Sequence, residues 1–172
     1  SKIFGGLLKK SVGVAEQRSL PKVYKFDFDK ELQKAKVQAN TTRSKVVLYI
    51  DEFTNYLDVD LGRDAIEVLT RLGYEVELFY AESGRTYISK GFLKAIGNVD
   101  KLSQLAEKGL PIIGLEPSAI LTFRDEYKRF GLDKKKMDAV AANSFLIEEF
   151  LAKEIQIGVL TSDLFTQEAK TV

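Results

Sequence analysis

The chain has 172 residues, with 26 Lys and Arg against 25 Asp and Glu, so its formal net charge is only +1. This balance removes the electrostatic basis for a nucleic-acid partner. The chain has no His and no Cys, which excludes a Ser-His-Asp or Cys-His triad, a thiolate nucleophile, a zinc site with Cys or His ligands and a Cys-ligated iron–sulfur cluster within it.

The length suits one domain, or one domain with an appendage, and needs no metal or disulfide for stability. No apolar stretch reaches the roughly 20 residues of a membrane span, and no charged and then apolar signal opens the chain. The absence of cysteine fits a reducing compartment. We therefore expect a cytoplasmic protein without a membrane span. A chain that starts at Ser1 without methionine and stops at Val172 is expected to be part of a longer protein.

Residues 1–44 carry no strand signal and are expected to wrap the outside of the core or to link it to an upstream domain. Ile3–Lys10 is typical of a short helix. Val14–Asp29 is expected to be extended around Pro21, and Glu31–Ala39 to form another short helix.

A clear pattern of alternating strands and helices begins at Lys45. Val46–Ile50 is a near-continuous apolar run, as in a strand buried on both faces. A helix is expected after Asp58 and is stopped by Gly73, and Tyr74–Tyr80 is the next strand. The apolar positions of this helix are Leu61, Ala65, Val68, Leu69 and Leu72.

Gly91–Lys108 predicts a helix that ends at Gly109, with Gly97-Asn98 as a candidate break. Pro111–Leu115 is a third short strand, and a helix is expected from about Pro117, a residue suited to a first helical turn. The side chains of that helix expected to face the sheet are Ile120, Leu121, Phe123 and Tyr127.

Ala139–Lys153 predicts a further helix, and Ile155–Leu160 with a short helix near Asp163–Ala169 closes the chain. The buried stripe of the further helix is expected to be Leu146, Ile147, Phe150 and Leu151. Alternating strands and helices with short loops indicate right-handed crossovers and a parallel sheet. The predicted fold is a three-layer α/β module, a βαβαβ core with helices on both faces and an N-terminal wrapping extension.

Each of the three predicted strands runs into a polar motif. The motifs are Asp51-Glu52-Phe53-Thr54-Asn55, Glu82-Ser83-Gly84-Arg85 and Glu116-Pro117-Ser118. The carboxyl ends of strands are where open α/β sheets bind ligands, so we expect these side chains to converge at one edge. No P-loop or Rossmann glycine motif follows the first strand. A phospho-acceptor receiver domain would need an aspartate at the end of the third strand, where this chain has Glu116 followed by proline.

Structural roles are open for the same residues. Gly84 suits a turn that requires a positive φ angle. Asp51, Thr54 and Asn55 either cap the next helix or belong to a binding site, and Pro117-Ser118 starts a helix in either case.

Glu82 and Glu116 are expected to meet at the sheet edge. Two neighbouring carboxylates there would bind a hard cation, share a proton or pair with Arg85. We favour the pair with Arg85.

The motifs together resemble a known family. Leu48–Tyr56 is similar to the opening strand and loop of the cysteine-rich "CCG" domain. Gly84–Gly91, which includes Ser89, is similar to the second half of its C-C-G-R-x-x-x-S-x-G motif. Gly114–Ala119 is similar to G-x-E-P-S-C, and Arg124–Tyr127 to R-D-E-Y. The CCG domain occurs in glycolate oxidase and D-lactate dehydrogenase type iron–sulfur subunits, in heterodisulfide reductases and in fused FAD-linked oxidases.

The chain differs from the family at its cysteines, because Glu82, Ser83 and Ala119 occupy those positions. The resemblance therefore implies a segment of a FAD-linked, iron–sulfur oxidoreductase whose own redox centre is lost, leaving a structural or docking role. FAD and an iron–sulfur cluster are expected in the parent protein and no cofactor in this chain. The implied partners are upstream flavin and ferredoxin-like domains and a second CCG-like lobe.

The resemblance also implies a division of the chain. Residues 1–44 would follow the ferredoxin-like module as a linker, and residues 45–172 would form the first half of a tandem. The alternative is a non-redox α/β module that binds a small ligand or a cation at the edge formed by Asp51, Glu82 and Glu116.

Overall fold

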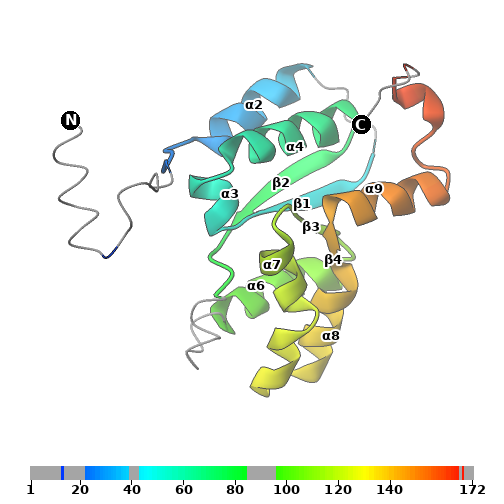
Figure 1. The fold of residues 1–172 in the computed structure, drawn as a ribbon. Helices are drawn as coiled ribbons and strands as arrows, with labels where there is room; N and C mark the ends of the chain where they lie inside the picture. Colours follow the sequence, from blue (N-terminus) through cyan, green and yellow to red (C-terminus); the bar gives the residue numbers. More distant parts are fainter. Residues whose placement is uncertain (1–12, 14–21, 39–42, 85–95, 167, 169–172) are drawn as a thin grey trace.

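The computed structural model describes residues 13, 22–38, 43–84, 96–166 and 168. Its centre is a four-stranded, all-parallel sheet with the strand order β2-β1-β3-β4, covered by helices on both faces (Figure 1). The strands are β1 (Lys45–Ile50), β2 (Glu75–Tyr80), β3 (Ile112–Gly114) and β4 (Ser144–Leu146). The predicted α/β class with a parallel sheet between helical layers is confirmed.

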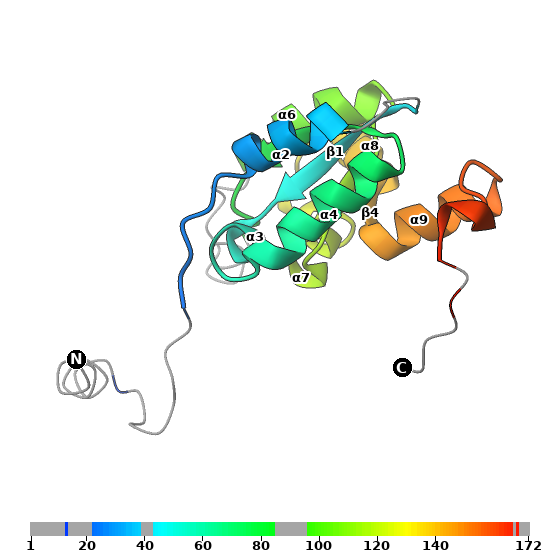
Figure 2. The same cartoon turned by 90° about the horizontal axis from the view of Figure 1, so that it is seen from above.

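Helices from both halves of the chain cover the sheet. The α-helices are α2 (Phe28–Gln38), α3 (Glu52–Tyr56), α4 (Val59–Arg71), α6 (Ile96–Glu107), α7 (Pro117–Ile120), α8 (Lys134–Asn143) and α9 (Ile147–Gln156). Short 3-10 helices span Leu121–Phe123, Glu126–Phe130 and Ser162–Leu164. α2 packs on α4 over one face, and α6 packs on α8 over the other (Figures 1 and 2). Within the described ranges, no helix is long and apolar enough to cross a lipid bilayer.

β1 is the centre of the core. Val46–Ile50 is at most 1% exposed, because β1 lies between β2 and β3 and has helices on both sides. Val46, Leu48 and Ile50 pack into the cluster under α2, α4 and α9. Val47 and Tyr49 pack into the opposite cluster, under α6, α7 and α8. The alternation of side chains along one strand thus supplies both halves of the core.

The predicted stop of α4 is confirmed at Gly73, which has a φ of +87°. The N–H of Gly73 donates to the Thr70 carbonyl and the N–H of Tyr74 to the Leu69 carbonyl, which satisfies the end of the helix. Of the predicted apolar stripe, Leu61 and Val68 are 49% and 40% exposed. The other three apolar positions are buried, together with Val59 and Ile66.

The short helix expected at Glu31–Ala39 is present as α2, but it starts earlier than predicted. α2 begins at Phe28, inside the predicted extended segment, because the Asp27 carboxylate accepts a hydrogen bond from the Lys30 N–H at 3.0 Å. Phe28 and Leu32 are buried against α4, so α2 packs into the same core as the sheet. The helix expected at Ile3–Lys10 lies outside the described residues.

The prediction of one helix over Ala139–Lys153 is wrong. α8 ends at Asn143, β4 pairs with β3 in parallel, and α9 begins at Ile147. β4 has three residues, and local periodicity does not reveal so short a strand, because its stability comes from pairing with the buried β3. The sheet therefore has one strand more than the predicted βαβαβ core.

Three smaller expectations also differ. The chain is helical through Gly97-Asn98, so that candidate break is absent. The helix from Pro117 has a single α-helical turn and continues as two 3-10 segments. After α9 the described chain ends in the 3-10 turn Ser162–Leu164, where a longer helix near Asp163–Ala169 was expected.

The contact between β3 and α7 gives a test of the packing. A Cβ added at Gly114 would collide with the Ile120 Cβ and lie 2.8 Å from its Cγ1. Overpacking of this kind costs about 1–3 kcal/mol, so Gly114→Ala is expected to lower the free energy of unfolding by that amount in urea titrations. Gly97→Ala is the control, since a Cβ there meets nothing within 4 Å and favours the helix. Equal stability of the two variants would contradict this packing.

Candidate functional site

The first loop at the carboxyl edge of the sheet is built around the buried carboxylate of Asp51, which is 1% exposed. Its Oδ1 accepts the N–H of Phe53 at 2.7 Å and that of Thr54 at 3.0 Å, and its Oδ2 accepts the Thr54 hydroxyl at 2.9 Å. Burial raises the pKa of Asp51, and the bonds from Thr54 and Phe53 oppose that rise. Asp51 and Thr54 thus cap α3, which was one of the two open roles.

The second loop is tied to the first through Ser83, which is fully buried. The Ser83 N–H donates to Glu52 Oε2 at 2.7 Å, and the Ser83 hydroxyl donates to Glu52 Oε1 at 2.6 Å. Both bonds end on a charged acceptor, which makes them stronger than neutral ones. Glu52 therefore links the end of β1 to the end of β2.

Two further groups hold the segment Glu82-Ser83-Gly84, which we call the Ser83 turn. The hydroxyl of the buried Tyr127 donates to the Ser83 carbonyl at 2.8 Å, and the Asn98 amide donates to the Glu82 carbonyl at 2.8 Å. Gly84 has a φ of +69°, as the sequence predicted for a turn glycine. The turn is thus fixed by α3, by α6 and by the chain that follows β3.

The third loop is a second helix cap. Glu116 Oε1 accepts the Ser118 N–H at 3.1 Å and the Ser118 hydroxyl at 2.5 Å, at the start of α7. Pro117 occupies the first turn, as predicted, and Ala119 is fully buried in the core. Glu116 and Ser118 thus have a structural partner within their own loop.

Of the three loops that were predicted to converge, the first and the second line a common hollow. A hollow of about 180 Å³ lies between them. It is lined by Ile50, Asp51, Glu52, Asn55, Tyr56, Tyr80, Ala81 and Glu82. Glu116 and Ser118 do not line this hollow, although the parallel strand order places their loop at the same edge of the sheet. Arg85, Ser89 and Gly91 lie outside the described residues, so the expected pairing of Arg85 with a carboxylate stays a prediction.

Tyr49, beneath this edge, is fully buried and stacks against Phe79 and Phe123. Burial, followed by the nearby carboxylates of Asp51 and Glu52, raises the pKa of its phenol. The Tyr49 hydroxyl has no hydrogen-bond partner in the part of the chain that the structure describes. Tyr49 serves the core and keeps a neutral polar group below the acidic loops.

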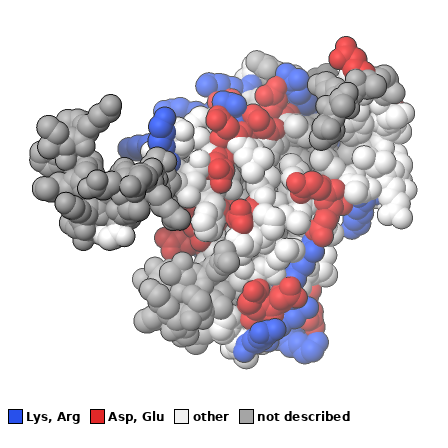
Figure 3. Space-filling model, in the orientation of Figure 1, with Lys and Arg blue, Asp and Glu red and all other residues white. Residues whose placement is uncertain are grey.

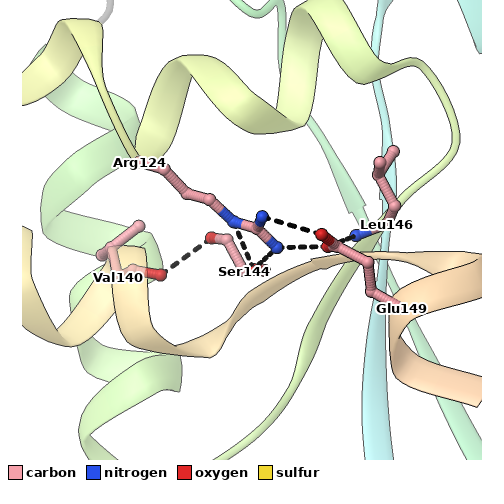
Figure 4. Close-up of polar contacts among 5 residues, drawn as sticks. All are labelled: Arg124, Val140, Ser144, Leu146 and Glu149. Atoms are coloured by element: carbon pink, nitrogen blue, oxygen red, sulfur yellow. Dashed lines mark hydrogen bonds and ion pairs between the residues drawn. The ribbon is translucent and has the colours of Figure 1, made fainter. Parts of the chain in front are cut away.

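A second polar network fixes β4, the edge strand on the far side of β3 (Figure 4). Arg124 donates from Nε at 3.0 Å and from Nη2 at 2.7 Å to the Ser144 carbonyl, and its guanidinium pairs with Glu149. Glu149 also accepts the Leu146 N–H at 2.9 Å. The hydrogen bond from Arg124, followed by the one from Leu146, lowers the pKa of Glu149.

Sequence reasoning gave no role to Glu52, Arg124 and the Tyr127 hydroxyl. The R-D-E-Y motif contained two of these residues and was a usable signal. Its arginine and tyrosine are the side chains that reach β4 and the Ser83 turn. The third, Glu52, was visible only as the neighbour of Asp51.

The donor set does not fit an iron–sulfur cluster. Glu82, Ser83 and Ala119 provide no thiolate, the Ser83 hydroxyl is bonded to Glu52, and Ala119 is a buried methyl group. Among the described residues, no group of three or more Asp or Glu side chains is arranged to hold a metal ion. Lys and Arg intermingle with Asp and Glu over much of the face in Figure 3.

Comparisons with known proteins identify relatives. The chain is similar to two groups of dehydrogenases. It is 28% identical to D-2-hydroxyglutarate dehydrogenase of Pantoea ananatis over 134 residues, 73% of this chain, and 31% identical to that of Pseudomonas putida over 146 residues, 75% of it. It is also 30% identical to one component of the anaerobic glycerol-3-phosphate dehydrogenase of Escherichia coli over 129 residues, 70% of this chain.

The relatives are much longer than this chain. The matches span only 13% and 14% of the two D-2-hydroxyglutarate dehydrogenases and 33% of the glycerol-3-phosphate dehydrogenase component. No family model matches the chain, and no solved structure is significantly similar to it. The chain is therefore similar to one part of longer dehydrogenases.

The Glu52–Ser83 link gives a stability test. Ser83→Ala removes the hydroxyl of a fully buried side chain and one donor from the half-buried Glu52, so we expect the free energy of unfolding to fall by about 1–3 kcal/mol. The matched control is Ser118→Ala, which removes a hydroxyl bonded to Glu116 in a half-buried loop. The control is expected to lose less than about 1 kcal/mol. Equal losses in urea titrations would show that the Ser83 turn has no special structural role.

The lowered pKa of Glu149 predicts a pH dependence. Its stabilisation is complete above the ordinary glutamate value of 4.5 and is lost as the pH falls through the lowered folded-state pKa. The pair is partly exposed, so wild type should exceed Glu149→Gln by about 1 kcal/mol at pH 7 and by almost nothing in strong acid. Urea titrations across this range measure the difference. Glu148→Gln, the control at the neighbouring exposed position, should show no such loss; a parallel profile would refute the assignment.

Proposed function

We propose that this chain is a segment of a FAD-linked, iron–sulfur oxidoreductase of the 2-hydroxy acid type. In this proposal the segment is a cysteine-rich domain that has lost its cysteines and has a structural or docking role. The observation that carries the proposal is the similarity to D-2-hydroxyglutarate dehydrogenases over 73% and 75% of the chain. The similarity to a component of a glycerol-3-phosphate dehydrogenase supports the same broad class.

The chemistry of the cysteine positions supports a role without a redox centre. Soft thiolates suit iron–sulfur clusters, whereas Glu82 offers hard oxygen ligands and Ala119 none. Ser83 is engaged in the contact with Glu52. Ser83 and the Glu82 carbonyl hold the loops together, which is the function we assign to this edge of the sheet.

The proposal includes the surroundings of the segment. Residues 45–172 would form the first half of a tandem, and residues 1–44 would connect it to a ferredoxin-like module. FAD and an iron–sulfur cluster would be bound by other parts of a cytoplasmic parent protein. The partners of this segment would be the flavin domain, the ferredoxin-like module and a second lobe.

The rival proposal was a cation or small-ligand site formed by Asp51, Glu82 and Glu116. Asp51 and Glu116 accept hydrogen bonds from the first turns of α3 and α7. Both carboxylates thus have a role that needs no ligand. No specific observation favours the rival, so we do not adopt it.

The test is whether the isolated chain lacks a redox centre and dehydrogenase activity. The purified chain should show no visible absorption band, no iron after anaerobic reconstitution, and no dye-linked oxidation of D-2-hydroxyglutarate, lactate or glycolate. The D-2-hydroxyglutarate dehydrogenase of Pseudomonas putida, assayed in parallel, is the positive control for D-2-hydroxyglutarate oxidation. Stoichiometric iron in the reconstituted chain would overturn the proposal, because oxygen ligands would then have replaced the thiolates.

A further inference from the structure

Two exposed tyrosines line the hollow between the first two loops, and a third lies beside one of them. Tyr24, Tyr56 and Tyr80 are 45%, 49% and 43% exposed. The Tyr24 N–H donates to the Tyr56 carbonyl at 2.8 Å, which places these two residues side by side. Tyr56 and Tyr80 line the hollow, and the Tyr80 hydroxyl donates to Asp29 at 2.9 Å, which fixes its ring. We call this surface the tyrosine hollow.

The charge of the tyrosine hollow has one sign. Its lining contains Asp51, Glu52 and Glu82 and no Lys or Arg. Asp51 and Glu52 are engaged by backbone and serine donors, whereas the Glu82 carboxylate has no ion pair in the described part of the chain. Lys22 and Lys25 flank Tyr24 along the chain but do not line the hollow. A carboxylate beside exposed aromatic faces is complementary to a planar cation.

The size of the hollow decides between a small molecule and a side chain. Its volume is about 180 Å³. Pockets for cofactors and drug-sized ligands usually measure about 300–1,000 Å³. The hollow suits a single side-chain head group better, and tyrosine and arginine are among the residues most enriched at the energetic centres of protein interfaces.

We propose that the tyrosine hollow is a docking site for an arginine side chain of a partner protein segment. The guanidinium would stack on Tyr56 and pair with Glu82, while Tyr24 and Tyr80 border the contact. This inference rests on the docking role proposed above and names the surface and the chemistry through which docking occurs.

The test is a titration of the purified, ¹⁵N-labelled 172-residue chain with the peptide acetyl-Gly-Arg-Gly-amide, followed by NMR. The proposal expects saturable shifts at the amides of Asn55, Tyr56, Ala81 and Glu82, weakened by added salt. Acetyl-Gly-citrulline-Gly-amide, which has the same shape without the charge, should cause no comparable shifts. Equal shifts with citrulline, or no saturation with arginine, would overturn the proposal.

Variants locate the contact. Glu82→Gln and Tyr56→Ala are each expected to weaken arginine binding about fivefold, the effect of losing an ion pair or a cation–π contact at an exposed site. Glu107→Gln removes one carboxylate from the exposed end of α6, outside the hollow, and should leave binding unchanged. A spectrum with native dispersion shows that each variant is folded, and Tyr56→Phe keeps the ring and should retain binding. Equal weakening by Glu107→Gln would overturn the proposal.

A titration with spermidine tests whether the ligand of the hollow is a protein side chain or a free polyamine. A flexible amine without a planar head group should bind more weakly than the arginine peptide, and tighter binding of spermidine would replace the docking site with a small-molecule site. This outcome is independent of the iron and activity measurements. If the arginine peptide does not bind, only the assignment of the tyrosine hollow as a docking site is refuted. If the reconstituted chain holds iron, the proposed docking role is refuted.

Discussion

The burial of β1 on both faces is the constraint on which the rest of the structure depends. A strand whose last five residues are at most 1% exposed needs a neighbour on each edge and a helical layer on each side. β2 and β3 satisfy the edges in parallel, and parallel pairing requires long crossovers, which are the helices themselves. All loops that follow the strands therefore lie at one edge. The position of the candidate site follows from the packing of a single strand.

At that edge the polar side chains mainly solve a structural problem. The first and third loops each end a strand and start a helix whose first N–H groups lack partners within the helix. Asp51 meets this need for α3, and Glu116 does so for α7. Glu149, in the first turn of α9, accepts the N–H of Leu146, the residue just before that helix. Acidic residues also interact favourably with the positive end of the helix dipole. The accumulation of acids thus has a physical cause that requires no substrate.

The fold class and the long elements could be predicted because their signals are local, as in the apolar run Val46–Ile50. β4 was missed because its three residues become a strand through pairing with β3, which no local pattern reports. The sequence placed polar loops at the carboxyl ends of the strands, but it did not reveal the contacts that these loops make. Glu52 rather than Asp51 reaches Ser83, because Asp51 is committed to its own helix. Tyr127 reaches the same turn across 44 residues of chain, a distance over which only the folded structure decides the partner.

The Ser83 turn is a structural link built from oxygen donors and acceptors. A serine has nearly the shape of a cysteine, but its hydroxyl is a stronger hydrogen-bond donor and a poor ligand for iron. In a buried place, such a hydroxyl needs a partner, since an unsatisfied one costs about 1–3 kcal/mol. Glu52 supplies that partner at 2.6 Å, and Tyr127 satisfies the carbonyl of the same residue. Once these bonds exist, a cysteine at position 83 would leave Glu52 with a weaker donor. The serine at position 83 is therefore favoured by the hydrogen bonds of the turn itself.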